Sequence, residues 1–154
     1  MPWREVLLVL GVSAAPISEL RGGIPLALAL GFAPEIAFFL ALVGNLLPLP
    51  LLLFLFPKIL RAVEKLPGWL GRAGRAYLAW QDRRKGAFAR WGPPALVLFV
   101  AIPSPGTGLW TGAVLASLLG IPGRRAGPFL ILGVLLAGIL VLGASLGLFR
   151  LFGI

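Results

Sequence analysis

Long apolar stretches run through the chain, and those without a charged side chain predict helices that cross a membrane. Residues 36–56 and 126–148 contain no ionisable side chain. A bilayer core about 30 Å thick requires about 20 apolar residues in a helix, so each stretch is long enough. The pattern therefore predicts two membrane-spanning helices, at residues 34–57 and 126–150.

Two further apolar regions, residues 2–32 and 92–121, are interrupted by glycine, proline and small polar residues. The interruptions read "ISELRGG" and "IPSPGTGLWTG". Each arm is too short to span a bilayer, and irregular backbone at membrane depth requires a cover of protein or a water-filled cavity. We expect two re-entrant helical hairpins whose broken segments face each other. Arg4, the apolar run after it and the small residues "SAA" also fit a secretory signal peptide, which stays open as an alternative.

The two halves of the chain match at an offset of 89 residues. Pro16 falls on Pro105, Gly23 on Gly112 and Gly44 on Gly133. A hairpin plus one span crosses the membrane an odd number of times, so the second copy must be inserted upside down, as in many secondary transporters. The predicted fold is an all-α polytopic membrane protein of one domain, 1–154. It is an inverted repeat in which residues 2–57 and 92–150 each form a re-entrant hairpin and a full transmembrane helix.

Composition strengthens the membrane interpretation and removes much catalytic chemistry. Of the residues, 59% are hydrophobic and only 12% are charged, more apolar surface than one soluble core can bury. Histidine and cysteine are absent, which removes the commonest general base, thiolate metal sites and cysteine nucleophiles. We expect no enzyme activity, no metal and no cofactor.

The net charge of +9 lies mostly on one predicted face of the membrane, which carries the connector 58–91 and the turn at Arg124 and Arg125. By the positive-inside rule the connector is cytoplasmic and both termini are outside. Aromatic residues in the connector fall on one helical stripe with arginines off it, which favours an amphipathic helix at the interface, in contact with anionic lipids. A simple topology anchor is the alternative. We expect no nucleic acid as a partner.

Glu19 and Arg21 are the ionisable residues predicted at membrane depth. A charge there costs at least about 2.5 kcal/mol on insertion scales, so it requires a use. We expect Glu19 to bind and release a coupling proton and Arg21 to hold an anionic group. In the alternative, the two side chains pair with each other and only fix the hairpin. Such pairing requires non-helical backbone, because residues i and i+2 do not face each other on a helix, and the candidates are Gly22, Gly23 and Pro25.

The second broken segment offers hydroxyls and backbone in place of charges. Candidate substrate contacts are Ser104, Thr107, Thr111 and Trp110, and the predicted hairpin-tip backbone comprises Pro103, Pro105, Gly106, Gly108 and Gly112. The glycines alternatively only permit a tight turn and close packing. Asn45, in the middle of the first span, is expected to bond to the open backbone of the first hairpin. Pro48 and Pro50 should kink that span.

The segments "ELRGGIPLALALGF", "GNLLPLP" and "PSPGTGLWTGAVLASLLGI" resemble those of the small multidrug export protein family of prokaryotes. That family is distantly similar to the DedA or VTT-domain superfamily, which has paired re-entrant hairpins and includes proton-dependent transporters and lipid flippases or scramblases. The resemblance implies transport across a prokaryotic plasma membrane, with Glu19 and Arg21 at the acid and base positions of the family motif. The second segment here is uncharged, unlike that of many DedA proteins.

These observations together favour a proton-coupled secondary transporter that exports small or amphipathic substrates, anionic ones among the candidates. A lipid flippase or scramblase that moves phospholipid or polyprenyl-phosphate headgroups is the nearest alternative. A non-transporting membrane scaffold is the alternative of a different class. Two full spans are few to enclose a pathway, so we expect a homodimer.

Overall fold

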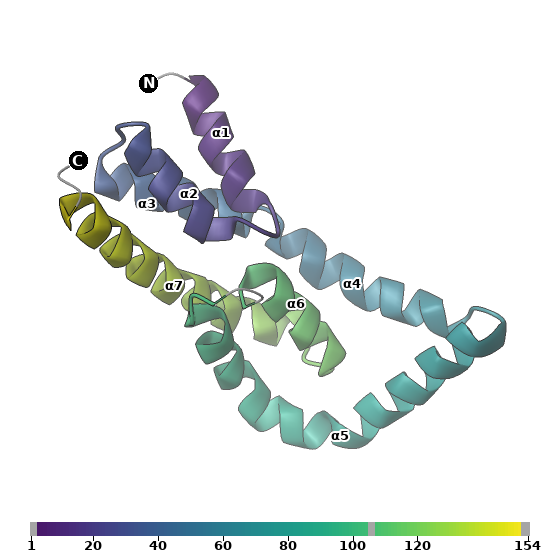
Figure 1. Ribbon diagram of the computed structural model, residues 1–154. Coiled ribbons are helices and arrows are strands. Elements are labelled where there is room, and N and C mark those ends of the chain that lie inside the picture. Colours follow the sequence, from purple (N-terminus) through teal and green to yellow (C-terminus); the bar gives the residue numbers. More distant parts are fainter. Residues whose placement is uncertain (1–2, 105–106, 152–154) are drawn as a thin grey trace.

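The computed structural model describes residues 3–104 and 107–151, except for the side chains of residues 81, 84–90 and 149. These ranges hold seven α-helices (Figure 1). They are α1 (Trp3–Ala14), α2 (Glu19–Ala29), α3 (Pro34–Leu46), α4 (Leu49–Glu64), α5 (Gly68–Ala101), α6 (Leu109–Leu118) and α7 (Gly123–Leu151). The described part of the chain contains no strand, in agreement with the all-α prediction.

The first three helices pack together as one unit. α1 and α2 form a hairpin whose turn, residues 15–18, we call the first tip. The Ser18 hydroxyl donates to the Val12 carbonyl and so satisfies a group at the open end of α1. Gly31, with φ of 84°, ends α2, and α3 then returns antiparallel to α2 (Figure 1).

The first predicted span is divided by a short break. α3 ends at Leu46 and α4 begins at Leu49, with Pro48 capping α4 and Pro50 in its first turn. This confirms the predicted kink, since proline has no backbone N–H to donate to the helix. Pro34–Glu64 and Gly123–Leu148 are the two stretches, among the described residues, that are long and apolar enough to cross a membrane.

The connector does not form a separate helix. α4 continues to Glu64, and α5 then runs from Gly68 through Pro93 and Pro94 to Ala101. The first arm of the second hairpin is therefore the end of α5, which bends along its length (Figure 1). Trp69 and Trp91 on this helix are 70% and 72% exposed.

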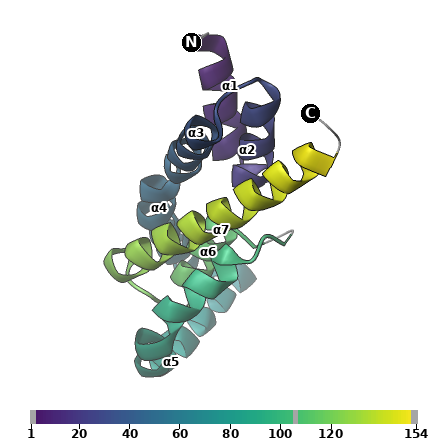
Figure 2. The ribbon, with the colours of Figure 1, turned by 90° about the vertical axis from the view of Figure 1, so that its left-hand side faces the viewer.

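The second half repeats the order of hairpin and long helix. The second tip, residues 102–108, joins α5 to α6, and α7 packs along both. α7 runs in the direction opposite to α3 and α4, and the two termini lie at the same end of the molecule (Figures 1 and 2). The Tyr77 hydroxyl donates to the Leu118 carbonyl and ties α5 to the end of α6.

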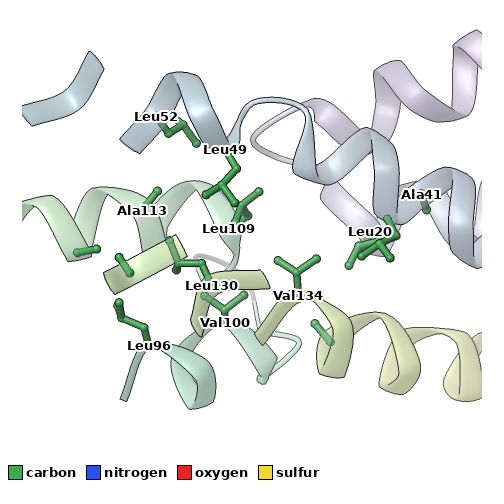
Figure 3. Close-up of a cluster of buried hydrophobic side chains, with 14 of the residues drawn as sticks. Leu20, Ala41, Leu49, Leu52, Leu96, Val100, Leu109, Ala113, Leu130 and Val134 are labelled. Atoms are coloured by element: carbon green, nitrogen blue, oxygen red, sulfur yellow. The ribbon is translucent and has the colours of Figure 1, made fainter. Parts of the chain in front are cut away.

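The core extends across both halves. Leu109, Leu130 and Val100 are fully buried at its centre, where α5, α6 and α7 meet (Figure 3). Leu20 of α2 and Leu49 of α4 join the same cluster. Large apolar side chains also cover the outside, among them Phe54 and Leu98 at 72% and 68% exposure. An apolar outer surface of this kind suits contact with lipid.

Glycines allow the same close packing in each half. A Cβ added at Gly44 would lie 2.7 Å from the Leu10 carbonyl oxygen and 2.8 Å from Ser13 Cβ. A Cβ added at Gly133 would lie 3.0 Å from the Val97 carbonyl oxygen and 2.8 Å from Val100 Cβ. Gly23 and Gly112, also related by the sequence offset, contact Ser13 and Val100 respectively. In both halves, one side chain of the first hairpin arm is therefore enclosed by two glycines.

Candidate functional site

The two hairpin tips meet each other, and the charged residues of the first lie against the backbone of the second. Glu19 is the first residue of α2 and only 9% exposed. Its φ of 45° lies in the left-handed region, which costs a non-glycine residue about 1–3 kcal/mol. The surrounding contacts must offset this cost.

The Glu19 carboxylate binds the start of α6. Its Oε1 accepts a hydrogen bond from the Trp110 backbone amide at 3.3 Å, and the Leu109 backbone also bonds to the carboxylate. The first amides of a helix have no partner within the helix, and the helix dipole is positive there. The carboxylate therefore satisfies two open donors and places its negative charge at the favourable end of α6.

Gly108 makes room for this contact. A Cβ added at Gly108 would overlap both carboxylate oxygens of Glu19 and lie 2.6 Å from its Cδ. Gly108 corresponds to Glu19 at the offset of 89 residues. The position in the second half that corresponds to Glu19 therefore has no side chain, and the Glu19 carboxylate occupies the space that a side chain would fill.

Arg21 binds carbonyls of the second tip, on the side where α5 ends. Its guanidinium donates to the carbonyls of Ser104 and Thr107, to Thr107 Oγ1 at 3.1 Å and, at 3.4 Å, to the Ile102 carbonyl. Ile102 caps the C-terminus of α5, where the carbonyls lack helical partners and the dipole is negative. The positive charge of Arg21 thus lies near the negative end of the α5 dipole, and the negative charge of Glu19 lies at the positive end of the α6 dipole.

Among the described residues, Glu19 and Arg21 bind different groups and form no ion pair with each other, so the alternative in which the two side chains pair is not what the structure shows. Gly22, Gly23 and Pro25 were expected to be non-helical, yet all three lie inside α2. The break falls earlier, at the first tip, because Gly23 is needed for close packing against Ser13 and not for a turn. Side chains at i and i+2 on a helix diverge and so bind different groups.

Trp110 makes a contact in the reverse direction. Its indole Nε1 donates to the carbonyl of Ala14, the last residue of α1, at 3.1 Å. Trp110 corresponds to Arg21 at the offset of 89 residues. Each hairpin therefore sends one donor side chain to the carbonyl end of the other hairpin's first arm.

The remaining predicted residues of the second segment divide into two groups. Thr107 and Ser104 form the loop that receives Arg21, and Thr107 Oγ1 also donates to the Ile102 carbonyl at 2.6 Å. Thr111 instead bonds to Gly108 within its own helix start, at 3.0 Å from the Gly108 amide. Pro103 lies in the second tip, Gly112 was expected there but is helical within α6, and Pro105 and Gly106 lie outside the described residues.

A pocket of about 260 Å³ opens where the tips meet. Its lining residues are Pro16, Ile17, Glu19, Arg21, Thr107, Gly108 and Thr111. The sequence interpretation named the charged and hydroxyl members but missed Pro16, Ile17 and the backbone partners. Backbone partners cannot be identified from residue types, because every residue has the same backbone groups. A glycine directly before a predicted helix does indicate a helix start whose first amides are free to bind a side chain. In the described ranges, no three acidic side chains gather as a metal site.

Asn45 is buried, but its side-chain oxygen has no hydrogen-bond partner within the described ranges. The predicted bond from this oxygen to open backbone of the first hairpin is therefore absent. The physical reason is that the backbone beyond the tip is helical and already paired, as the bond from the Gly22 amide to the Ser18 carbonyl at 2.9 Å shows.

Replacing Arg21 by lysine should lower the thermal stability of the purified protein. An ammonium group cannot reach the several carbonyls that the planar guanidinium contacts, and each lost charge-assisted bond contributes about 1.5–3 kcal/mol. Arg75→Lys is the matched control, because Arg75 is exposed and donates to one carbonyl, that of Glu64. Melting temperatures in detergent compare the two variants. Equal melting temperatures would show that the Arg21 contacts do not hold the tips together.

Comparison with known proteins gives one result. No curated protein and no solved structure matches the chain. A family model with the description "Putative small multi-drug export protein" matches residues 19–140. The matched region begins at Glu19 and includes both halves of the site, so the chain belongs to this small multidrug export protein family, whose name indicates a role in membrane transport.

Proposed function

We propose that this protein is a proton-coupled secondary transporter in the plasma membrane of a prokaryote, with its site between the two hairpin tips. The observation that carries the proposal is one pocket, in a largely apolar protein, that is lined by a buried acid, Glu19, and a half-buried base, Arg21. Intramembrane ionisable residues are costly and mark ion or substrate pathways. In this proposal Glu19 carries the proton and Arg21 contacts an anionic group of the substrate.

The inverted repeat is part of the proposal. Three features support it: the matching glycine pairs around Ser13 and Val100, the reciprocal contacts of Arg21 and Trp110, and the opposite directions of α7 and α3–α4. In inverted-repeat transporters, substrate sites lie where the ends of broken helices meet. The pocket between the first and second tips has that position.

The contacts suggest how proton binding would act on the site. An ionised Glu19 holds the start of α6, and protonation removes the charge that favours this end of the helix dipole. Arg21 stays positive, so protonation changes the pair from neutral to cationic. Proton binding and anion binding then favour each other, and release of the proton restores the contact between the tips.

The surroundings of the pocket favour amphipathic substrates. Thr111 lines the polar pocket and also a separate apolar groove of about 380 Å³ beside α6. Phe99, Val114 and Leu118 line that groove. A molecule with a polar head and an apolar tail could occupy both sides of Thr111. The same observation favours the second candidate function, movement of lipid headgroups between leaflets.

Transport by purified protein in liposomes tests the proposal. We expect accumulation of small cationic or anionic amphiphiles, or movement of labelled phospholipids, to depend on an imposed pH gradient. Movement of lipids alone would favour the lipid transporter. If neither solutes nor lipids move with or without the gradient, the protein is a scaffold and the transport proposal fails.

The proposed orientation puts residues 58–91 in the cytoplasm and both termini outside. The chain has no native cysteine, so single cysteines report position without background. A cysteine at Gly86 should be protected from an impermeant thiol reagent in intact cells, whereas a cysteine at Ala33, exposed between α2 and α3, should react. The reverse labelling pattern would invert the orientation.

We also propose that the protein forms a homodimer through α7. Gly143 and Gly147 lie one turn apart on α7, and a Cβ added at either would meet nothing within 4 Å. Small residues with this spacing allow a second helix to approach closely. The expected partner is α7 of another copy.

A further inference from the structure

Two polar side chains inside the first half lack hydrogen-bond partners. Ser13 and Asn45 are 0% and 1% exposed. Ser13 Oγ and Asn45 Oδ1 have no partner among the groups that the structure describes. A buried polar atom without a partner loses its hydration and gains nothing in return, so each such atom in a native protein requires an explanation.

Packing does not explain them, because in the second half valines occupy the equivalent surroundings. Gly112 and Gly133 enclose Val100 as Gly23 and Gly44 enclose Ser13. Val134 follows Gly133 in the chain as Asn45 follows Gly44. Val100 and Val134 are each 1% exposed, so both valines fit an interior of this shape.

The two polar residues lie on the side of the first half that is nearer the first tip, where α2 begins with Glu19. A Cβ added at Gly23 would contact Ser13 and would lie 3.2 Å from the Cβ of Ala41, which places α1, α2 and α3 together at this level. Glu19 is one helical turn from Gly23, toward the first tip. Because α2 and α3 are antiparallel, Asn45 is one turn from Ala41 in the same direction. Glu19 and Asn45 are therefore at the same level on two packed helices.

We propose that Ser13 and Asn45 bind water inside the first half, and that this water exchanges protons with Glu19. The step rests on the proposed proton coupling of Glu19. A buried water needs two to four polar partners, and a hydroxyl, which both donates and accepts, together with a carboxamide meets that need. An arriving proton binds the water, another proton of that water moves to the Glu19 carboxylate, and the water is left unchanged. Release of the proton follows the reverse order.

Solid-state NMR of the wild-type protein in bilayers tests the water site without any transport assay. Asn45 is the only asparagine in the chain and Tyr77 the only tyrosine, so residue-type labelling gives one signal for each. We expect magnetisation to pass from water to the Asn45 side chain at a rate within about threefold of that for the partly exposed Tyr77. Absence of transfer to Asn45 would overturn the water site.

Replacing Ser13 and Asn45 by valine, the residue found in the equivalent surroundings of the second half, tests the proton route. Ser13→Val with Asn45→Val should give a melting temperature at or above that of the wild type, because valines fit the equivalent interior of the second half. The same protein should lose gradient-driven transport to the level of empty liposomes and keep gradient-independent exchange of substrate. Ser145→Ala is the matched control, because Ser145 is buried but bonds to the Val141 carbonyl at 2.8 Å within its own helix.

The two experiments separate failure of this inference from failure of the proposed function. Water contact at Asn45 together with wild-type gradient-driven transport in the double valine variant overturns the proton route and leaves the transporter proposal intact. Failure of the wild-type protein to transport overturns the transporter proposal and with it the proton route, whereas the NMR result still decides the water site. A double valine variant that melts below the wild type would show that the polar pair serves the fold.

Discussion

Replacing Glu19 by glutamine is expected to reduce proton-driven transport in liposomes to the level of protein-free vesicles. Glutamine has nearly the same shape, and its side-chain oxygen can still accept the Trp110 amide, so we expect the fold to persist. The amide cannot carry a proton and has no charge to hold the start of α6. The substitution therefore removes both the proton-binding step and the charge-dependent contact with α6.

The measurement is substrate flux with and without a pH gradient. Glu35→Gln is the matched control, because Glu35 is an exposed glutamate in the first turn of α3, away from the tips. We expect its gradient-driven flux to equal that of the wild type. Wild-type gradient-driven flux in Glu19→Gln would assign the proton to another group and leave Glu19 a structural role.

Gly108→Ala should lower the stability of the protein. The added Cβ would overlap the Glu19 carboxylate, and the carboxylate cannot retreat without leaving the amides of α6. Overpacking of this kind destabilises a protein by about 1–3 kcal/mol. Gly11→Ala is the control, because Gly11 lies inside α1, nothing lies within 4 Å of that position, and alanine in a helix interior is favoured over glycine by about 1 kcal/mol.

A double-mutant cycle with Glu19→Ala isolates the contact. Removing the carboxylate removes the atoms that the new methyl group would meet, so the alanine at 108 should cost less in the Glu19→Ala background than in the wild type. Unfolding in detergent, followed by circular dichroism, gives the four free energies. Strict additivity of the two changes would show that Glu19 and Gly108 do not contact each other in the membrane protein.

The sequence was sufficient to predict the helical class, the two long apolar stretches, the proline break at Pro48 and the presence of Glu19 and Arg21 beside the second broken segment. Each of these depends on residue type and spacing along one segment. Run length, proline and charge are local properties, and they survive in whatever tertiary arrangement the chain adopts.

The partners of the charged pair could not be predicted in the same way. Glu19 binds amides of Leu109 and Trp110, and Arg21 binds carbonyls of the second tip, groups that every residue has. The glycines of α2 were misplaced for a related reason. A glycine marks a turn or a close approach equally well, and only the neighbouring helix shows which of the two applies.

The distance along the chain between the charged pair and its partners has a consequence for biogenesis. The contact from Trp110 to Glu19 joins residues 91 positions apart, and the contact from Arg21 to Ser104 joins residues 83 apart. During synthesis the charges therefore leave the ribosome long before α6 exists. An unpaired charge in the bilayer costs at least about 2.5 kcal/mol, so the first hairpin should wait at the membrane surface until α6 arrives. Insertion of the N-terminal segment would then be the last step of assembly, although it is the first part of the chain to be made.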